Sequence, residues 1–214
     1  MCGSTVISWG RSRPRSMTSS PAAGLATKRR TPMQETELRP GFKPVRIAVL
    51  TISDTRSFDN DRSGDTLADR LQDAGHILAA RDIVRDDRAS IAEKFRSWAA
   101  DPQIEVIIST GGTGVTGRDV TPEALGDVIE KRIDGFGELF RWISFRKIGT
   151  STIQSRADAG VLAGTYIFVL PGSPGACRDG WDDILKDQLD IRHKPCNFAE
   201  LLPRLREHEG REAL

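Results

Sequence analysis

A short loop of glycines and threonines carries the clearest sign of ligand chemistry in this sequence. It consists of Thr110, Gly111, Gly112, Thr113 and Gly114. Glycines let the backbone approach a ligand closely and can turn several N–H donors into one concavity. With threonine hydroxyls beside them, these donors suit a phosphate or the polar edge of a heterocycle. A merely tight turn is the alternative, although a turn does not need so many small polar residues in a row.

Two aspartates lie in loops that follow apolar runs. Asp119 comes soon after the glycines, and Asp86 follows an earlier run. Two carboxylates beside phosphates can hold Mg²⁺ and so neutralise charge in phosphoryl transfer. Arg118 and Arg88 are candidates to pair with phosphate oxygens in the forked manner of guanidinium groups. The alternative for these four residues is an ordinary solvated loop charge.

A proline- and glycine-containing turn follows a later apolar run. It contains Pro171, Gly172 and Ser173, and a predicted helix begins at Pro174. The N–H groups of the turn and the positive end of that helix would face the same side as the glycine loop, a common arrangement for anion binding. A plain corner between strand and helix is the alternative.

Three further polar residues stand out less clearly. Glu138 follows Gly135-Phe136-Gly137, and Ser155 precedes Arg156. Taken alone, Glu138 is typical of an acid near a helix N-terminus, and Arg156 is typical of a surface charge.

Two common nucleotide-binding motifs are excluded. Gly112, Gly114 and Gly117 spell GxGxxG, but a dinucleotide fingerprint begins its helix within the glycines of the first strand–helix unit. Here the loop follows the third predicted strand, and Thr121 with Pro122 opens the helix beyond the glycines, as N-cap and first-turn residue. A P-loop is also absent, because the sequence contains no Gly-Lys-Ser or Gly-Lys-Thr.

Composition narrows the class of protein further. The formal net charge of +1 gives no basic field for nucleic acid or an acidic membrane surface. No stretch approaches the roughly 18 continuous apolar residues of a membrane span. The cysteines, Cys2, Cys177 and Cys196, form no CxxC pair, which favours a reducing compartment. We therefore expect a cytoplasmic protein in which Cys177 is a small buried helix residue.

Strands that alternate with helices must position these loops. Strands are predicted at 46–53, 77–84, 104–110 and 165–170. Helices are predicted around 67–74, 91–99, 121–129, 136–147 and 174–188, with a further helix at the apolar end of 157–162. This alternation predicts an α/β fold with a mostly parallel sheet covered on both faces. Ligands then bind outside the carboxyl ends of the strands, where Asp54-Thr55-Arg56 also follows the first strand.

The N-terminal segment differs from the centre of the chain in amino-acid composition. Residues 1–42 are rich in Arg, Ser and Thr and have no acid before Glu35, so we predict a disordered basic extension. A flexible tail, an over-long start before Met17 or Met33, and an organelle transit peptide remain open interpretations. The folded domain is predicted to span 43–205, followed by a flexible tail at 206–214.

Several motifs together resemble the molybdenum cofactor biosynthesis protein B family, within the wider superfamily of molybdopterin-binding proteins and molybdopterin adenylyltransferases. The matching segments are TGGTG (Thr110–Gly114), RDVTPE (Arg118–Glu123), GFGE (Gly135–Glu138), IGTSTIQSRADAGV (Ile148–Val161), LPGSPGAC (Leu170–Cys177) and RHKPCNF (Arg192–Phe198). The resemblance runs from about Arg46 to Pro203 in unbroken order, and TGGTG followed by RDVTPE is specific in combination.

The resemblance implies a three-layer α/β/α fold that assembles as a homotrimer, or as a homohexamer built from trimers. It implies that molybdopterin lies near the glycine loop and the Pro171–Pro174 turn. Asp119 and Asp86 are implied to be the catalytic and Mg²⁺-holding residues, although Asp87 leaves a one-residue ambiguity. The implied substrate-binding residues are Thr110, Gly111, Gly112, Thr113, Gly114, Arg118, Thr121, Glu138, Ser155, Arg156, Pro171, Gly172 and Ser173.

The reaction implied by the resemblance is adenylylation of molybdopterin. MgATP would donate AMP to the terminal phosphate of molybdopterin and release pyrophosphate, with a downstream molybdenum-insertion enzyme as a possible partner. No protein nucleophile is needed, which agrees with the lack of a Ser/His or Cys/His pair near the loops. A protein that binds or carries molybdopterin without turnover is the alternative.

Overall fold

The computed structural model describes residues 41–207 of the chain. The predicted basic extension, up to residue 40, and residues 208–214 of the predicted tail lie outside the described residues. Phe42, at the start of the described part, places its ring 5.2 Å from the ring of His76.

A six-stranded sheet forms the centre of the domain, in the order β2-β1-β3-β6-β5-β4. The strands are β1 (Arg46–Ile52), β2 (Ile77–Val84), β3 (Val106–Thr110), β4 (Lys131–Arg132), β5 (Asp158–Leu162) and β6 (Thr165–Leu170). Strands β2, β1, β3 and β6 are parallel, whereas β5 runs antiparallel to β6 and β4 antiparallel to β5. The predicted mostly parallel sheet is therefore confirmed.

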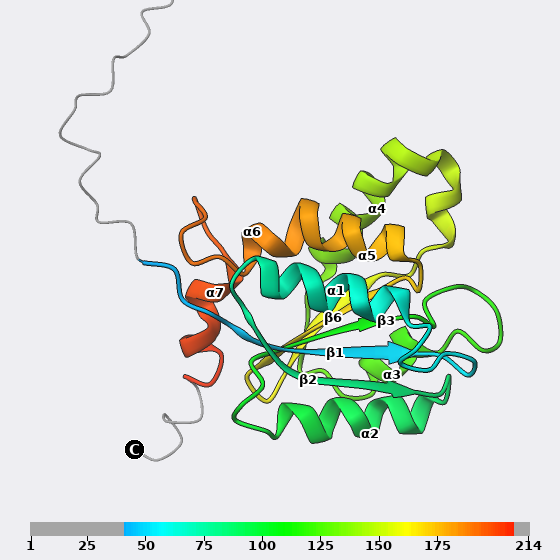
Figure 1. The fold of residues 1–214 in the computed structure, drawn as a ribbon, viewed down its shortest axis with the longest axis horizontal. Coiled ribbons are helices and arrows are strands. Elements are labelled where there is room, and N and C mark those ends of the chain that lie inside the picture. Colours follow the sequence, from blue (N-terminus) through cyan, green and yellow to red (C-terminus); the bar gives the residue numbers. More distant parts are fainter. Residues whose placement is uncertain (1–40, 208–214) are drawn as a thin grey trace, which may run out of the picture. The chain divides into compact units, whose positions relative to one another are not determined.

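Helices cover both faces of this sheet (Figure 1). They are α1 (Arg62–Asp73), α2 (Arg88–Ala99), α3 (Thr121–Gly126), α4 (Asp134–Ile148), η2 (Gly149–Gln154), α5 (Pro174–Gly180), η3 (Trp181–Leu185), α6 (Lys186–Gln188), α7 (Phe198–Leu201) and η4 (Leu202–Arg204). Helices α1, α4 and α5 lie on one face, and α2 and α3 on the other, which confirms the predicted three-layer α/β/α fold. Among residues 41–207, no helix is long and apolar enough to cross a membrane.

Each face of the sheet has its own apolar core. On one face, Leu71 of α1, Phe140 of α4 and Trp181 of η3 pack in one buried cluster. On the other face, Phe95 of α2 and Leu125 of α3 pack in a second cluster. Burial of this apolar area is the main favourable contribution to folding, and it fixes the helices over the strands whose ends carry the site.

The helix predicted at the end of 157–162 is wrong, because this segment forms strand β5. Ala163 and Gly164 have φ values of 47° and 77° and join β5 to β6 in a two-residue turn. Positive φ at both positions is typical of the hairpin turn whose twist matches that of paired strands. Pairing through this turn outweighs the apolar spacing that favoured a helix.

The order of the strands creates a switch point between β1 and β3. The chain leaves β1 through α1 to reach β2 on one side, and then crosses through α2 to β3 on the other side. Thr51 of β1 lies opposite Thr110 of β3, which lies opposite Leu170 of β6. The loops that follow these three strands therefore meet at one edge, where open α/β sheets bind ligands.

Candidate functional site

A crevice of about 790 Å³ lies at the carboxyl ends of the parallel strands. Its walls come from the loops after β1, β2, β3 and β6, and from α4 and η2. The predicted site residues that line it are Asp86, Thr110, Gly111, Gly112, Thr113, Gly114, Arg118, Asp119, Ser155, Pro171, Gly172 and Ser173. The structure thus brings together most of the residues that the sequence singled out.

The glycine loop takes a conformation that only glycine adopts without strain. Gly111 has φ of 113°, and a Cβ atom there would collide with the carbonyl oxygen of Ile52. The Gly111 N–H donates to the carbonyl of Leu170 at 3.0 Å, which ties the loop to the end of β6. Within residues 41–207, the N–H groups of Gly112 and Thr113 have no hydrogen-bond partner. They are donors that this loop can offer to a ligand.

Two predicted site residues, Thr121 and Thr110, form hydrogen bonds to the backbone of the glycine loop and of the neighbouring turn. The Thr121 hydroxyl, fully buried, donates to the Gly111 carbonyl at 3.0 Å, and its N–H donates to the Gly112 carbonyl at 3.0 Å. Thr121 is the first residue of α3 and not its N-cap, which is Val120. The Thr110 hydroxyl donates to the Pro171 carbonyl at 3.0 Å and is therefore engaged within the protein.

Asp119 is held as an ionised carboxylate by its own loop. Its Oδ2 accepts the Thr116 N–H at 2.9 Å and the Thr116 hydroxyl at 2.6 Å. Burial acts to raise the pKa of Asp119, but these bonds, the Gly114 N–H and the charge of Arg156 outweigh it and hold the pKa below its usual value. Asp119 therefore both caps the loop and presents negative charge to the crevice.

Asp86 lies among other carboxylates. Burial, together with the nearby charges of Asp54 and Asp119, raises the pKa of Asp86, against the opposing effect of the Asp54 N–H and of Arg118. Asp87 instead caps α2 by accepting the Ser90 N–H at 2.8 Å. Of the two neighbouring aspartates, Asp86 is thus the one that faces the crevice.

The carboxylates near Asp86 are partly neutralised by one arginine. Arg118 forms an ion pair with Asp54, and its side chain remains 71% exposed. Residues 41–207 contain no ready-made cluster of three or more metal-ligating side chains. Arg88 lies outside the crevice lining, because it pairs with Asp127 at 2.6 Å on the surface.

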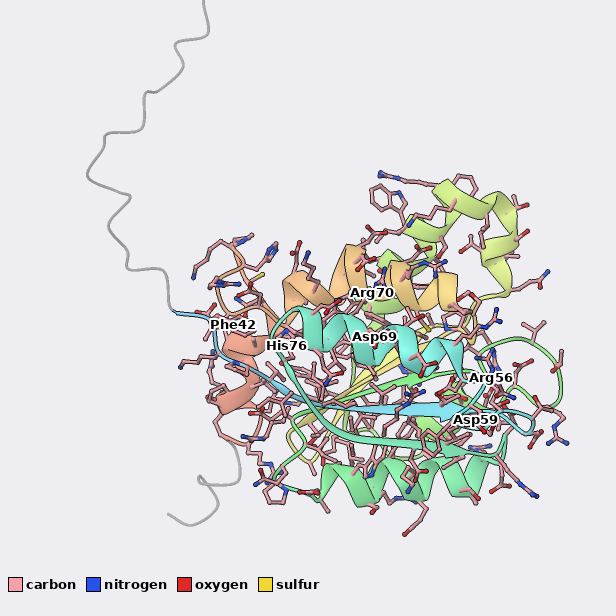
Figure 2. The ribbon with its side chains drawn as sticks, in the orientation of Figure 1. Phe42, Arg56, Asp59, Asp69, Arg70 and His76 are labelled. Carbon is pink, nitrogen blue, oxygen red and sulfur yellow. The ribbon has the colours of Figure 1, made fainter. Side chains whose placement is uncertain are left out.

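A buried carboxylate fixes the loop that follows β1. Asp61 is fully buried and accepts hydrogen bonds from the Thr51 hydroxyl at 2.7 Å and from Arg81 at 2.9 Å. Beside it, Arg56 and the Ser63 hydroxyl both donate to the Gly172 carbonyl, at 3.1 and 2.8 Å. This polar group joins the β1 loop to the turn after β6. Figure 2 shows Arg56 at this end of the strands and His76 at the other.

Arg156 and Glu138, like Thr121, are predicted site residues that lie outside the crevice lining. Arg156 braces the glycine loop from behind, since it donates to the Gly114 carbonyl at 2.7 Å and to the Asp119 carbonyl at 2.6 Å. Glu138 lines a separate cavity that Arg156 also lines, and Ser155 lines both this cavity and the crevice.

Asp54, Arg56 and Ser63 all line the crevice, although the sequence assigned Asp54 and Arg56 a place at the expected edge but no role, and assigned Ser63 neither. Asp54 and Arg56 directly follow β1, at the same sheet edge as the glycine loop, so their position after a strand was an available signal. Ser63 had no such signal, because it lies within α1 and reaches Gly172 only through the fold.

Cys177 has the role expected of a buried small residue. Burial raises the pKa of its thiol to about 11, so it stays protonated at neutral pH. It contacts the Thr110 hydroxyl at 3.1 Å inside the core.

These features define a doubly wound α/β protein with a polar crevice at the carboxyl ends of its parallel strands, and comparisons with known proteins agree with this fold class. Residues 48–191 match the family model described as "Probable molybdopterin binding domain". The molybdenum cofactor biosynthesis protein B of Escherichia coli (strain K12) is 48% identical over 157 residues, which cover 73% of this chain and 92% of that protein. The chain belongs to this molybdopterin-binding family and, within it, to the group of molybdenum cofactor biosynthesis protein B.

Solved structures show the same fold. A crystal structure of molybdenum cofactor biosynthesis protein B superposes with a TM-score of 0.70 at 37% identity, covering 77% of this chain and 98% of that chain. The tungsten cofactor synthesizing protein MoaB from Pyrococcus furiosus superposes with a TM-score of 0.60 at 31% identity, covering 66% of this chain and 91% of that chain.

Replacing the buried carboxylate of Asp61 is expected to destabilise the domain. Asp61→Ala leaves Arg81 without its buried partner, and we expect a loss of roughly 3 kcal/mol in the free energy of unfolding, measured by urea denaturation at pH 7. Asp65→Ala is the matched control, because Asp65 also pairs with Arg81 but is half exposed; its expected loss is below about 1 kcal/mol. Equal losses in the two variants would contradict this account.

The buried carboxylate of Asp61 also predicts that the stability of the fold decreases in acid. Burial alone raises the pKa of Asp61, but hydrogen bonds from Thr51, Gly64 and Arg81 hold it below its ordinary value of 3.8. A lowered pKa stabilises the fold above pH 3.8, and that contribution is lost as the pH falls through the folded-state pKa. The stability difference between the parent and Asp61→Asn should therefore shrink on acidification below about pH 4.

Proposed function

We propose that this protein, which acts in the molybdopterin pathway, binds molybdopterin and transfers AMP to its terminal phosphate from MgATP, with release of pyrophosphate. The observation that carries the proposal is the meeting of the glycine loop, Asp86, Asp119 and the Pro171–Ser173 turn in one crevice. This set combines N–H donors that can bind phosphates with carboxylates that can hold a cation. Both kinds of group are needed to stabilise the charge that develops in phosphoryl-type transfer.

Mg²⁺ fits the side chains that line the crevice. Asp86 and Asp119 both line the crevice, and the charge of Asp119 adds to burial and to the charge of Asp54 in raising the pKa of Asp86. Protein sites usually hold Mg²⁺ through one or two carboxylates together with substrate phosphates, so a preassembled cage of ligands is not needed. Bound there, the ion would neutralise charge between the two phosphate-bearing substrates.

The chain's own groups would bind and orient the phosphates. The N–H groups of Gly112 and Thr113 are donors, and the Ser173 hydroxyl caps the start of α5 by accepting the Ala176 N–H at 3.1 Å. The partial positive charge at the start of this helical run favours an anion. Arg118, exposed at the crevice, supplies a guanidinium that can leave Asp54 for a phosphate oxygen.

No protein nucleophile takes part in the proposed step. The attacking atom is a phosphate oxygen of molybdopterin, and the α-phosphorus of ATP receives it while pyrophosphate leaves. Within residues 41–207, the crevice lining contains neither histidine nor cysteine. The protein would act by positioning two anions in line and by offsetting their repulsion.

A second candidate function is a carrier that binds molybdopterin without turnover. It is favoured by the hydrogen bonds of Asp119 to Thr116, which give this carboxylate a structural use. The two functions differ in whether MgATP is consumed.

Removing the charge of Asp119 separates these functions. Asn keeps a side-chain oxygen for Thr116 but loses the negative charge, so Asp119→Asn should lower pyrophosphate release from MgATP and molybdopterin by more than roughly 100-fold. Asp59→Asn is the control, because Asp59 is exposed on the β1 loop outside the crevice lining. A folded Asp119→Asn variant with the parental rate would leave Asp119 only a capping role. Tight molybdopterin binding by a parent that releases no pyrophosphate would favour the carrier.

We also propose that the protein is cytoplasmic, forms a trimer or a hexamer, and passes its product to a molybdenum-insertion enzyme. Exposed apolar side chains on α4 support self-association, namely Trp142, Phe145 and Ile148, which are 54–57% exposed. We expect light scattering to give a trimeric or hexameric mass, and a monomer at all concentrations would contradict this assembly.

A further inference from the structure

Two side chains hold the backbone carbonyl oxygen of Gly172. The Arg56 Nη2 atom donates to this oxygen at 3.1 Å, and the Ser63 hydroxyl donates to it at 2.8 Å. The Arg56 Nη1 atom also donates to the Ser63 hydroxyl oxygen at 3.1 Å, so the three groups bind one another. Nothing in the proposed transfer of AMP gives Arg56 or Ser63 a role.

This set of three groups is anchored in the protein interior. Ser63 lies on α1 and is fully buried. The Arg56 guanidinium lies 3.6 Å from the carboxylate of Asp61, which is fully buried as well. Gly172 also packs against the glycine loop, where an added Cβ would lie 3.2 Å from the Gly111 Cα. The Gly172 carbonyl is therefore held in one direction.

The direction of this carbonyl sets the direction of the next N–H group. The peptide that joins Gly172 to Ser173 is trans, so its N–H lies opposite to its carbonyl. Because Arg56 and Ser63 hold the carbonyl, the Ser173 N–H points away from both. Within residues 41–207 this N–H has no hydrogen-bond partner, and Ser173 lines the crevice. A guanidinium bound to the carbonyl also polarises the peptide, which makes its N–H a stronger donor.

We propose that Arg56 is a positioning residue which, together with Ser63, turns the Gly172–Ser173 peptide so that the Ser173 N–H binds a phosphate group of a substrate. This inference rests on the proposed function, in which both substrates carry phosphates. The charge of Arg56 acts in the same sense, because Arg56 and Arg118 are the two basic residues of the crevice lining in the part of the chain that the structure describes.

A guanidinium suits this role better than an ammonium group does. Two nitrogen atoms of Arg56 reach the Ser63 hydroxyl and the Gly172 carbonyl at the same time, in one rigid plane. A lysine would keep the positive charge, but its single nitrogen atom cannot reproduce this fork. Arg56→Lys therefore separates the positioning of the peptide from the charge alone.

The test measures the Kd of the full chain for molybdopterin and for MgATP, each alone, by titration calorimetry. Arg56→Lys and Ser63→Ala should each weaken the binding of one substrate by about tenfold and leave the Kd of the other within about twofold. The substrate that is affected carries the phosphate that Ser173 binds. Arg62→Lys is the matched control, because Arg62 is exposed on α1 outside the crevice lining, and it should keep both parental Kd values.

The double variant tests whether the two side chains act through one carbonyl. If they do, their effects are coupled, and Arg56→Lys combined with Ser63→Ala should bind about as weakly as the weaker single variant. Independent contributions would multiply instead, to about 100-fold. Urea denaturation of each variant would show separately any loss of stability, which by itself does not change the Kd of the folded protein.

The outcomes separate this inference from the proposed function. A parental Kd for both substrates in folded Arg56→Lys or Ser63→Ala overturns the positioning role, even if the parent transfers AMP. An equal weakening for both substrates, or multiplied effects in the double variant, overturns it as well. The predicted loss in a parent that releases no pyrophosphate upholds the role of Arg56 and counts against the transferase. A parent that binds neither substrate overturns both.

Discussion

The backbone of Gly111 approaches the carbonyl of Ile52 so closely that no side chain fits between them. At the same residue, the N–H group binds the end of β6, and a Cβ on Gly172 would lie 3.2 Å from the Gly111 Cα. The ends of β1, β3 and β6 thus converge on one glycine. Without this contact the three loops would spread apart, and the N–H donors would no longer face the carboxylates across the crevice.

Two polar clamps hold the converged loops in place. On one side, Asp61 anchors the loop after β1 while Arg56 and Ser63 bind the Gly172 carbonyl. On the other side, Arg156 binds the loop that carries Asp119. Both clamps use charged groups that are partly or fully withdrawn from solvent, where a hydrogen bond left unmade is costly. The crevice can therefore keep several carboxylates close together before any cation or substrate arrives.

The sequence predicts the layers and the crevice well, because periodicity and strand-end loops are local signals. It predicts less well what depends on partners distant in the chain. The hydroxyl of Thr110 was predicted to bind a ligand, but in the fold it donates to the carbonyl of Pro171. The sequence left Asp86 and Asp87 as alternatives, and only the fold shows that Asp87 caps α2 while Asp86 lines the crevice. Glu138 was expected with the other site residues, yet the course of α4 carries it to a neighbouring cavity.

The central claim is that the crevice joins AMP to molybdopterin, and the fate of the α-phosphorus tests it most directly. The protein would be incubated with molybdopterin, Mg²⁺ and ATP radiolabelled at either the α- or the γ-phosphorus. The account predicts that the α-label moves into the pterin-containing product while the γ-label leaves in pyrophosphate. Release of the γ-label as inorganic phosphate, with no α-label on the pterin, would contradict it.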